Sequence, residues 1–281
     1  MTYQVKLNEH LAQYRREVLG VKEAGKWANP RTGLSATYEH ILPDGYREKN
    51  ICSPFRDRFW HQFREWAEKE PSHVVRLHRN FSHLNSSQAL CFNLFYPLIA
   101  DHNWALNFVH DVLSLPKERP RRQAFEWVED PEEETNYDFF IQMQSGRKLF
   151  FEVKLSEVGF GTTKADAEHL AKLTRIYEPK LRKLVDGKWL EAATFCARYQ
   201  LLRNMSHLTS KDHLLFFVVP KANSSLKKSL EELPRITNGP LNGRVRVLYL
   251  EDLVSKITEL LGAADGPLKD HYFEVKRKYV I

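Results

Sequence analysis

The spacing of apolar residues changes along the chain from a helical period to a strand-like alternation. Up to about residue 80, apolar residues recur three or four positions apart, which is typical of one face of an α-helix. Two such stripes are Leu7, Leu11, Tyr14 and Val18, and then Phe55, Phe59, Phe63 and Trp66. Ser53 and Pro54 precede the second stripe as an N-cap and a first-turn proline. We interpret both stripes as packing faces; the alternative is a partner surface on the aromatic helix of residues 55–66.

Short β-rich segments follow, separated by turns and by helical patterns. The predicted strands are 121–128, 137–143, 148–155, 214–219 and 244–250. The predicted helices are 85–96, 98–115, 164–208 with interruptions near Pro179 and Gly187, one helix between the last two strands, and 251–261. Segment 214–219 is apolar throughout, which indicates an interior strand. Asn85 and Gln88 suggest a capping box at the first of these helices, and Pro97 predicts a kink or restart.

These elements predict an α/β fold with a central mixed β-sheet flanked by helices and an α-rich N-terminal extension. The chain has 281 residues, of which 42% are hydrophobic and 28% charged, so a packed core is expected and a wholly disordered chain is excluded. We predict an α-rich extension at residues 1–80, packed on a core at 81–281 that ends in a strand–helix elaboration.

Composition also indicates the cellular environment of the protein and the class of partner it binds. The longest uncharged apolar stretch, 89–100, falls short of the roughly 18 residues that span a bilayer, so we expect no membrane segment. No signal-peptide pattern is present, and three widely separated cysteines favour neither a disulfide framework nor a zinc site, so we expect a cytoplasmic protein. A net charge of +6 is a mild bias toward polyanions such as nucleic acid.

The most informative segment is 136–156, which reads as a β-hairpin. A three-residue loop, Gln144 to Gly146, with Gly146 in the left-handed conformation, fixes a register in which paired positions sum to 290. Phe139 then pairs with Phe151, and Asp138 lies opposite Glu152 on the other face. Directly opposed side chains have Cβ atoms roughly 5 Å apart, so these two carboxylates can share a cation.

Such a pair is costly unless a cation compensates it, because opposed like charges repel. Two carboxylates and a backbone carbonyl, that of Val153, would leave coordination positions of Mg²⁺ for water and a phosphate oxygen. Lys154 on the same face can stabilise negative charge on a phosphate or orient the attacking water. An acid-x-lysine triplet occurs four times in the chain, but only the one at Glu152 has an acid on a preceding strand of a predicted hairpin.

At these residues the chain resembles the PD-(D/E)XK nuclease superfamily, which has the restriction-endonuclease-like fold, in its bacterial restriction-endonuclease-like branch. Asp138 matches the Asp of the motif and Glu152-Val153-Lys154 match its (D/E)XK; the resemblance covers about residues 85–220. It includes the flanking segments 85–95 and 199–204. Tyr137 replaces the motif proline. A glutamate on the helix before the sheet is missing; Gln88 and, on the first strand, Glu126 are the candidates.

The resemblance implies an Mg²⁺-dependent deoxyribonuclease, with Mn²⁺ as a substitute metal. Asp138, Glu152 and the Val153 carbonyl would hold the metal, Lys154 would assist the water or the transition state, and Gln200 would be a catalytic auxiliary. Further auxiliary candidates are Glu126, Gln88 and Arg203; Gln200 and Arg203 lie one helical turn apart, although a solvated helix face explains their positions almost as well. Basic segments 117–122 and 175–183 would suit phosphate contacts. We expect DNA as the partner and leave a homodimer open. The alternatives are a catalytically silent nucleic-acid-binding module of this fold and a structural or interaction protein.

Overall fold

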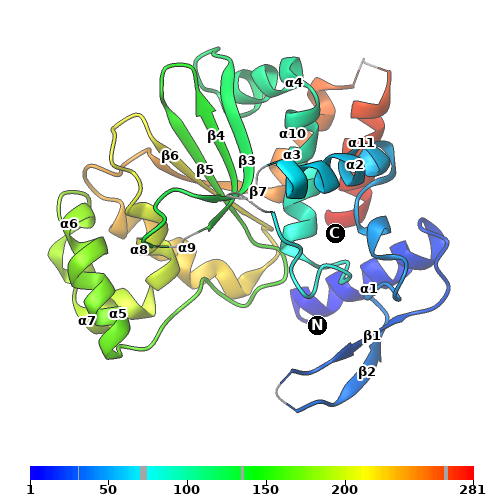
Figure 1. Ribbon diagram of the computed structural model, residues 1–281, viewed down its shortest axis with the longest axis horizontal. Helices are drawn as coiled ribbons and strands as arrows, with labels where there is room; N and C mark the ends of the chain where they lie inside the picture. Colours follow the sequence, from blue (N-terminus) through cyan, green and yellow to red (C-terminus); the bar gives the residue numbers. More distant parts are fainter. Residues whose placement is uncertain (31, 70–74, 134–135, 263–264) are drawn as a thin grey trace.

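The structure is a computed structural model that describes residues 1–30, 32–69, 75–133, 136–262 and 265–281 (Figure 1). Its strands are β1 (Gly25–Ala28), β2 (Ser35–Tyr38), β3 (Pro120–Val128), β4 (Asn136–Met143), β5 (Lys148–Val153), β6 (Leu214–Val219) and β7 (Val245–Tyr249). Its α-helices are α1 (Tyr3–Glu17), α2 (Ser53–Lys69), α3 (Ser87–Ala100), α4 (His102–Asn107), α5 (Ala167–Lys172), α6 (Glu178–Leu181), α7 (Ala192–Ala197), α8 (Tyr199–Met205), α9 (Lys227–Ile236), α10 (Leu250–Leu260) and α11 (Pro267–Tyr279). None of the helices in these ranges combines the length and apolar character needed to cross a bilayer.

The central sheet has five strands in the order β3-β4-β5-β6-β7. The first three strands are antiparallel neighbours, and β6 and β7 continue the sheet in parallel with β5. Each predicted strand is present within two residues at both ends, and β6 is buried along its whole length, as its continuous apolar sequence predicted. The mixed α/β sheet flanked by helices is therefore confirmed.

Alternation along the central strands produces two apolar cores, one on each face of the sheet. Phe139, Phe151 and Phe216 face a core that also includes residues of α1 to α4, α10 and α11. Phe150 and Phe217 face a second core, which is closed by the segment Leu173–Tyr177 and by α6 to α9. Figure 1 shows the two groups of helices on opposite sides of the sheet. The strands thus lie in the middle layer of three, where side chains on both faces are withdrawn from water.

The N-terminal region packs into the first core. Phe55 is 6% exposed and Phe59 is fully buried, so the aromatic stripe of α2 is an interior surface, and the hypothesis of a partner surface there is wrong. The prediction that this region contains only helices and loops is also wrong, because β1 and β2 form a separate two-stranded hairpin. Its strands have four residues each, which is too short for a periodic signal. The boundary at residue 80 remains a prediction.

Helix α3 continues past Pro97 to Ala100, so the expected restart occurs four residues later, where Asp101 caps α4. A proline has no N–H for the carbonyl four residues earlier, which here is that of Asn93. His271 on α11 supplies the missing donor, with its Nε2 at 2.7 Å from that carbonyl oxygen. Burial lowers the pKa of His271 to about 4, which keeps the ring neutral. Helix α11, which lies beyond the last predicted helix, thus compensates the proline.

Pro179 likewise does not interrupt its helical segment. A π-helical turn at Leu173–Tyr177 leads directly into α6, where Pro179 occupies the first turn and needs no backbone donor. The helical run instead ends after Leu181, and the second predicted interruption coincides with a short 3₁₀ turn at Gly187–Trp189.

The hairpin turn between β4 and β5 is the one predicted. Phe139 pairs with Phe151, Phe140 with Phe150 and Ile141 with Leu149, all of which sum to 290. Gly146 has a φ of +88°, and nothing lies within 4 Å of the position that a Cβ atom would occupy. The backbone conformation alone therefore selects glycine here.

We predict that Gly146→Ala lowers the free energy of unfolding by about 1 to 2 kcal/mol, because an L-residue is strained at positive φ. Urea denaturation of the two proteins measures this difference. Gly187→Ala is a matched control, since its added Cβ also meets nothing within 4 Å but its φ is not in the left-handed region. The control should unfold at the same urea concentration as wild type or at a higher one; equal losses in both variants would contradict the account of the turn.

Candidate functional site

The candidate site lies where β4 and β5 stop pairing. Phe139–Phe151 is the last regular pair on this side of the hairpin. Two residues further along β5, the backbone N–H of Val153 donates to Oδ2 of Asp138, at 2.6 Å, instead of to a backbone carbonyl of β4. The N–H and carbonyl of a strand residue point to the same neighbour, so the Val153 carbonyl is also directed toward this opening. The end of the ladder thus brings Asp138 and two backbone groups of Val153 together.

The start of β4 departs from the strict alternation of side chains between the two faces of the sheet. Strict alternation would place Tyr137 on the same face as Phe139, but it packs in the second core together with Phe140. Its hydroxyl donates to the backbone carbonyl of Asn204 on α8 at 2.7 Å. Strict alternation therefore holds from Phe139 onward and fails at the two residues that begin the strand.

Glu152 is held from three directions. Its Oε1 accepts from Gln200 Nε2 at 2.7 Å and contacts Lys154 Nζ at 2.9 Å, while its Oε2 accepts from Asn204 Nδ2 at 3.0 Å. The Glu152 side chain is 4% exposed and that of Lys154 is 12% exposed. Gln200 is in turn fixed by the N–H of Gly161, which donates to its Oε1 at 2.8 Å. The orientation of the Glu152 carboxylate is therefore set by two amides and one ammonium group.

The charges of Asp138, Glu152 and Lys154 are coupled. Burial and the neighbouring Glu152 charge raise the pKa of Asp138 well above its ordinary value, against the opposing effects of Lys154 and the Val153 N–H. Burial opposes the positive charge of Lys154, but the charges of Glu152 and Asp138 outweigh it and raise the pKa of Lys154. Lys154 is thus protonated in this arrangement. It can donate hydrogen bonds but cannot act as a base.

Helix α3 and strand β3 add a third acid. Glu126, 12% exposed at its side chain, accepts from Gln88 Nε2 at 2.8 Å and adds to the electrostatic rise in the pKa of Asp138. It has a φ of +49°, which is strained for a residue other than glycine. The expected capping role of Gln88 is wrong: Ser86 caps α3, and Gln88 also accepts from the His78 N–H at 2.8 Å.

Arg203 was a predicted auxiliary residue and its neighbour Asn204 was not. Of these two described residues, Asn204 is the one that contacts Glu152. The Arg203 guanidinium lies over the ring of Tyr199, 5.4 Å from its centroid, and no hydrogen bond joins it to Glu152 among the described residues. Asn204 was not selected from the sequence, yet it is fully buried and bonds directly to Glu152. It lies four positions after Gln200, and residues four apart share a helix face, so the spacing could have identified it.

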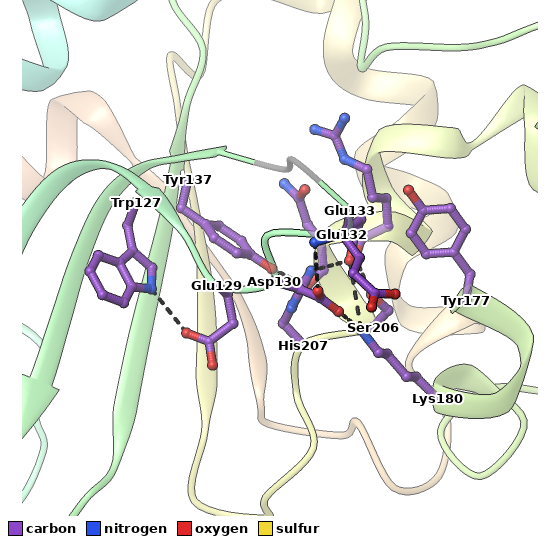
Figure 2. A network of polar contacts seen from close by, with 12 residues as sticks. Trp127, Glu129, Asp130, Glu132, Glu133, Tyr137, Tyr177, Lys180, Ser206 and His207 are labelled. Atoms are coloured by element: carbon purple, nitrogen blue, oxygen red, sulfur yellow. Dashed lines mark hydrogen bonds and ion pairs between the residues drawn. The ribbon is translucent and has the colours of Figure 1, made fainter. Parts of the chain in front are cut away.

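A second polar network lies at the C-terminal end of α8 (Figure 2). Its centre is an ion pair between Glu133 Oε2 and His207 Nε2, 2.7 Å apart and at most 2% exposed. Lys180 lies 2.6 Å from Asp130 and 3.8 Å from Glu133, and the Tyr137 ring packs edge-on against His207. The segment after β3 is thereby fastened to the end of α8, which is the helix that presents Gln200 and Asn204 to Glu152.

The predicted basic segments do not both adjoin the site. Pro120 pairs with Met143 and Trp127 with Tyr137, so the 117–122 segment lies at the end of β3 and β4 farthest from Asp138. Phosphate contacts by this segment stay a prediction, and they would lie away from Asp138. In the other segment, Lys180 is paired with Asp130 and Arg182 with Glu178.

The oxygen donors present suit a hard divalent cation. Oε1 of Glu152 already has two donors, but Oε2 has one, so a lone pair remains there, and Asp138 uses only Oδ2 in its contact with Val153. No group of three His, Cys, Asp or Glu side chains in the described ranges is arranged to hold a metal ion. Mg²⁺ does not require one, because it commonly binds through one or two carboxylates, waters and a substrate phosphate.

We predict that Asp138→Asn stabilises the metal-free protein increasingly as pH rises. A raised pKa in the folded state means that the wild-type protein loses stability as pH increases from the ordinary aspartate pKa to the raised one; Asn stays neutral and can still accept from Val153. Melting temperatures across pH 5 to 9 in chelator measure this. Asp186→Asn is the control: Asp186 is 63% exposed at its side chain and its pKa is lowered by the Lys188 N–H, so that variant should gain nothing. A melting temperature that falls strongly in Asp138→Asn would show a structural role instead.

Comparison with known proteins gives one match. No curated protein and no solved structure matches the sequence. A family model described as restriction endonuclease associating with ARP matches residues 8–280, which is nearly the whole chain. The match spans the N-terminal helices, the five-stranded sheet and α11 alike. The chain therefore belongs to this restriction-endonuclease family.

Proposed function

We propose that the chain is a metal-dependent endonuclease of the PD-(D/E)XK type that hydrolyses phosphodiester bonds of DNA. The observation that supports this most directly is the meeting of Asp138, Glu152 and Lys154 at the edge where β4 leaves β5. Membership of a restriction-endonuclease family suggests nuclease activity and DNA as the substrate. A buried acid, Glu152, and a partly buried acid, Asp138, beside an ammonium group whose pKa their charges raise, match the electrostatic needs of that reaction.

In this proposal Asp138, Oε2 of Glu152 and the Val153 carbonyl hold Mg²⁺, with Mn²⁺ as a substitute. When bound, the metal supplies Lewis acidity toward a phosphate oxygen and a water. Glu126 is an outer acid, since Gln88 holds it and it acts electrostatically on Asp138. Positive charge at this position would relieve the repulsion that raises the pKa of Asp138.

The residues of the chain have separable roles in the proposed hydrolysis, in which water bonds to phosphorus as a bond from phosphorus to a deoxyribose oxygen breaks. Lys154, kept protonated by its neighbours, donates to a phosphate oxygen and stabilises charge that grows there. Gln200 and Asn204 hold the Glu152 carboxylate at a fixed angle. Arg203, on the same helix, is a candidate contact for a neighbouring phosphate.

The wider setting of the activity is part of the same proposal. The family description mentions association with ARP, and we extend such a partner to this chain. A homodimer and a cytoplasmic location remain predictions from the sequence. The free, buried thiols of Cys52, Cys91 and Cys196 agree with the expectation that the chain has no disulfide framework.

Cleavage of supercoiled plasmid tests the proposal. We expect wild-type protein to nick or linearise the plasmid with Mg²⁺ and not with chelator, and Glu152→Gln and Lys154→Met each to lose at least about a hundredfold in rate. Asp186→Asn and Lys188→Met make the same kinds of change, carboxylate to amide and lysine to methionine, in an exposed acid-x-lysine triplet and should cleave like wild type. Binding of DNA without cleavage under any metal condition would favour the silent module instead.

A further inference from the structure

The β1–β2 hairpin is the described part of the chain that stands apart from both cores. Its two strands pair only with each other, and all four residues of β2 are exposed. Figure 1 shows it extending away from the body, past the end of the sheet. A two-stranded ribbon is marginally stable by itself in water, so its retention in an exposed position calls for a reason.

The base of the hairpin is rigidly attached. Gly25 is buried, and a Cβ atom there would lie 2.4 Å from the carbonyl oxygen of Leu42, so only glycine fits. The Gly25 N–H donates to the Ile41 carbonyl at 2.8 Å, and Ile41 forms a bridge with His83. The hairpin is therefore an arm with a fixed base, and its direction is set by the body of the protein.

The two faces of this arm differ. On one face Trp27 packs edge-on against Tyr38 and His83, and its Nε1 donates to Asn80 at 3.0 Å. The register places the opposite set together on the other face: Lys26, Ala28, Ser35 and Thr37. All four are exposed. The outward face thus presents a cation and two hydroxyl groups on a narrow surface of small side chains.

A continuous set of contacts joins the arm to the candidate site. Arg79 donates to the Ala28 carbonyl at 3.1 Å, and Asn80 accepts from Trp27. His78 precedes Arg79 in the chain, and its backbone N–H donates to the Gln88 side chain. Gln88 in turn donates to Glu126, which acts electrostatically on Asp138. The segment from His78 to Asn80 therefore contacts both the arm and Gln88, so one short stretch of chain links the arm to the residues beside the candidate site.

The charge of the arm is suited to a polyanion. Lys22, Lys26 and Arg79 are exposed. Two acids, Glu23 and Glu39, lie between residues 22 and 40. Glu39 is paired with Arg15 at 2.7 Å and with Arg16 at 3.2 Å, so its charge is offset and Glu23 is the other negative charge in this range. Protein interfaces are typically centred on large aromatic or arginine anchors, and the outward face has none.

We propose that the outward face of the β1–β2 hairpin enters a groove of the duplex DNA bound at the candidate site, with Lys26 contacting phosphate. A two-stranded ribbon fits the major groove, which is about 12 Å wide, and short hydroxyl side chains can reach base edges there. The proposal rests on the proposed function, because it takes the substrate to be duplex DNA. In this proposal the hairpin makes contacts with DNA that lie outside the reaction centre.

The test is fluorescence anisotropy with a labelled duplex of about 25 base pairs, in chelator, across a range of salt concentrations. Lys26→Glu and Thr37→Glu should each weaken binding severalfold, and Lys26→Glu should lower the salt slope by about 1. Lys188→Glu is the matched control, since it makes the same charge change at an exposed lysine in the 3₁₀ turn at Gly187–Trp189, outside the predicted basic segments. Melting temperatures of all three variants verify that each is folded.

The outcomes separate this inference from the proposed function. If wild type cleaves plasmid but Lys26→Glu and Thr37→Glu bind duplex as tightly as Lys188→Glu, the hairpin does not contact DNA and the inference is overturned, while the nuclease proposal stands. Unchanged DNA affinity together with loss of a protein partner would mean that the hairpin is a protein-docking arm. If wild type neither binds nor cleaves DNA, both proposals fail.

Discussion

Two acids kept close together at the end of a β-ladder impose the constraint on which this site depends. Burial and the neighbouring charge of Glu152 both raise the pKa of Asp138, so a negative charge on Asp138 is costly. The chain nevertheless does not separate them: the Val153 N–H fixes one, and Gln200, Asn204 and Lys154 fix the other. Lys154 supplies one positive charge, so the two acids, when both are ionised, keep a net negative charge that the neutral amide donors do not balance.

The surrounding architecture serves to maintain this arrangement. Strand β5 is central: it pairs with β4 as far as Phe151 and with β6 as far as Val153. Glu152 is opposite Phe217 on β6, and the Lys154 N–H donates to the Val218 carbonyl at 2.9 Å, so β6 fixes the backbone of both residues. Helix α8 reaches Glu152 from one core, and α3, through Gln88, reaches Glu126 from the other. The buried pair of Glu133 and His207 fastens α8 in turn (Figure 2). Each acid is thus supported by a different layer of the fold.

The sequence predicted local features well where one strong physical rule applied. The alternation after Phe139, the turn at Gly146 and the apolar run of β6 each depend on neighbouring residues only, and each was predicted correctly. The failures involve partners distant in sequence. His271, on α11, compensates Pro97, and Tyr137 changes face to reach Asn204. The links from Gln88 to His78 and Glu126 could not be inferred from spacing, whereas the link from Asn204 to Glu152 could have been.

The most direct test of the central claim is whether Mg²⁺ binding depends on Asp138. With the cation at about 100 times its dissociation constant, the folded wild-type protein should gain roughly 2.7 kcal/mol, seen as a higher melting temperature in Mg²⁺ than in chelator. Asp138→Asn should show a much smaller shift, while Asp186→Asn, exposed on the surface, should keep the full one. A full Mg²⁺ shift in Asp138→Asn, or none in wild type, would contradict the account.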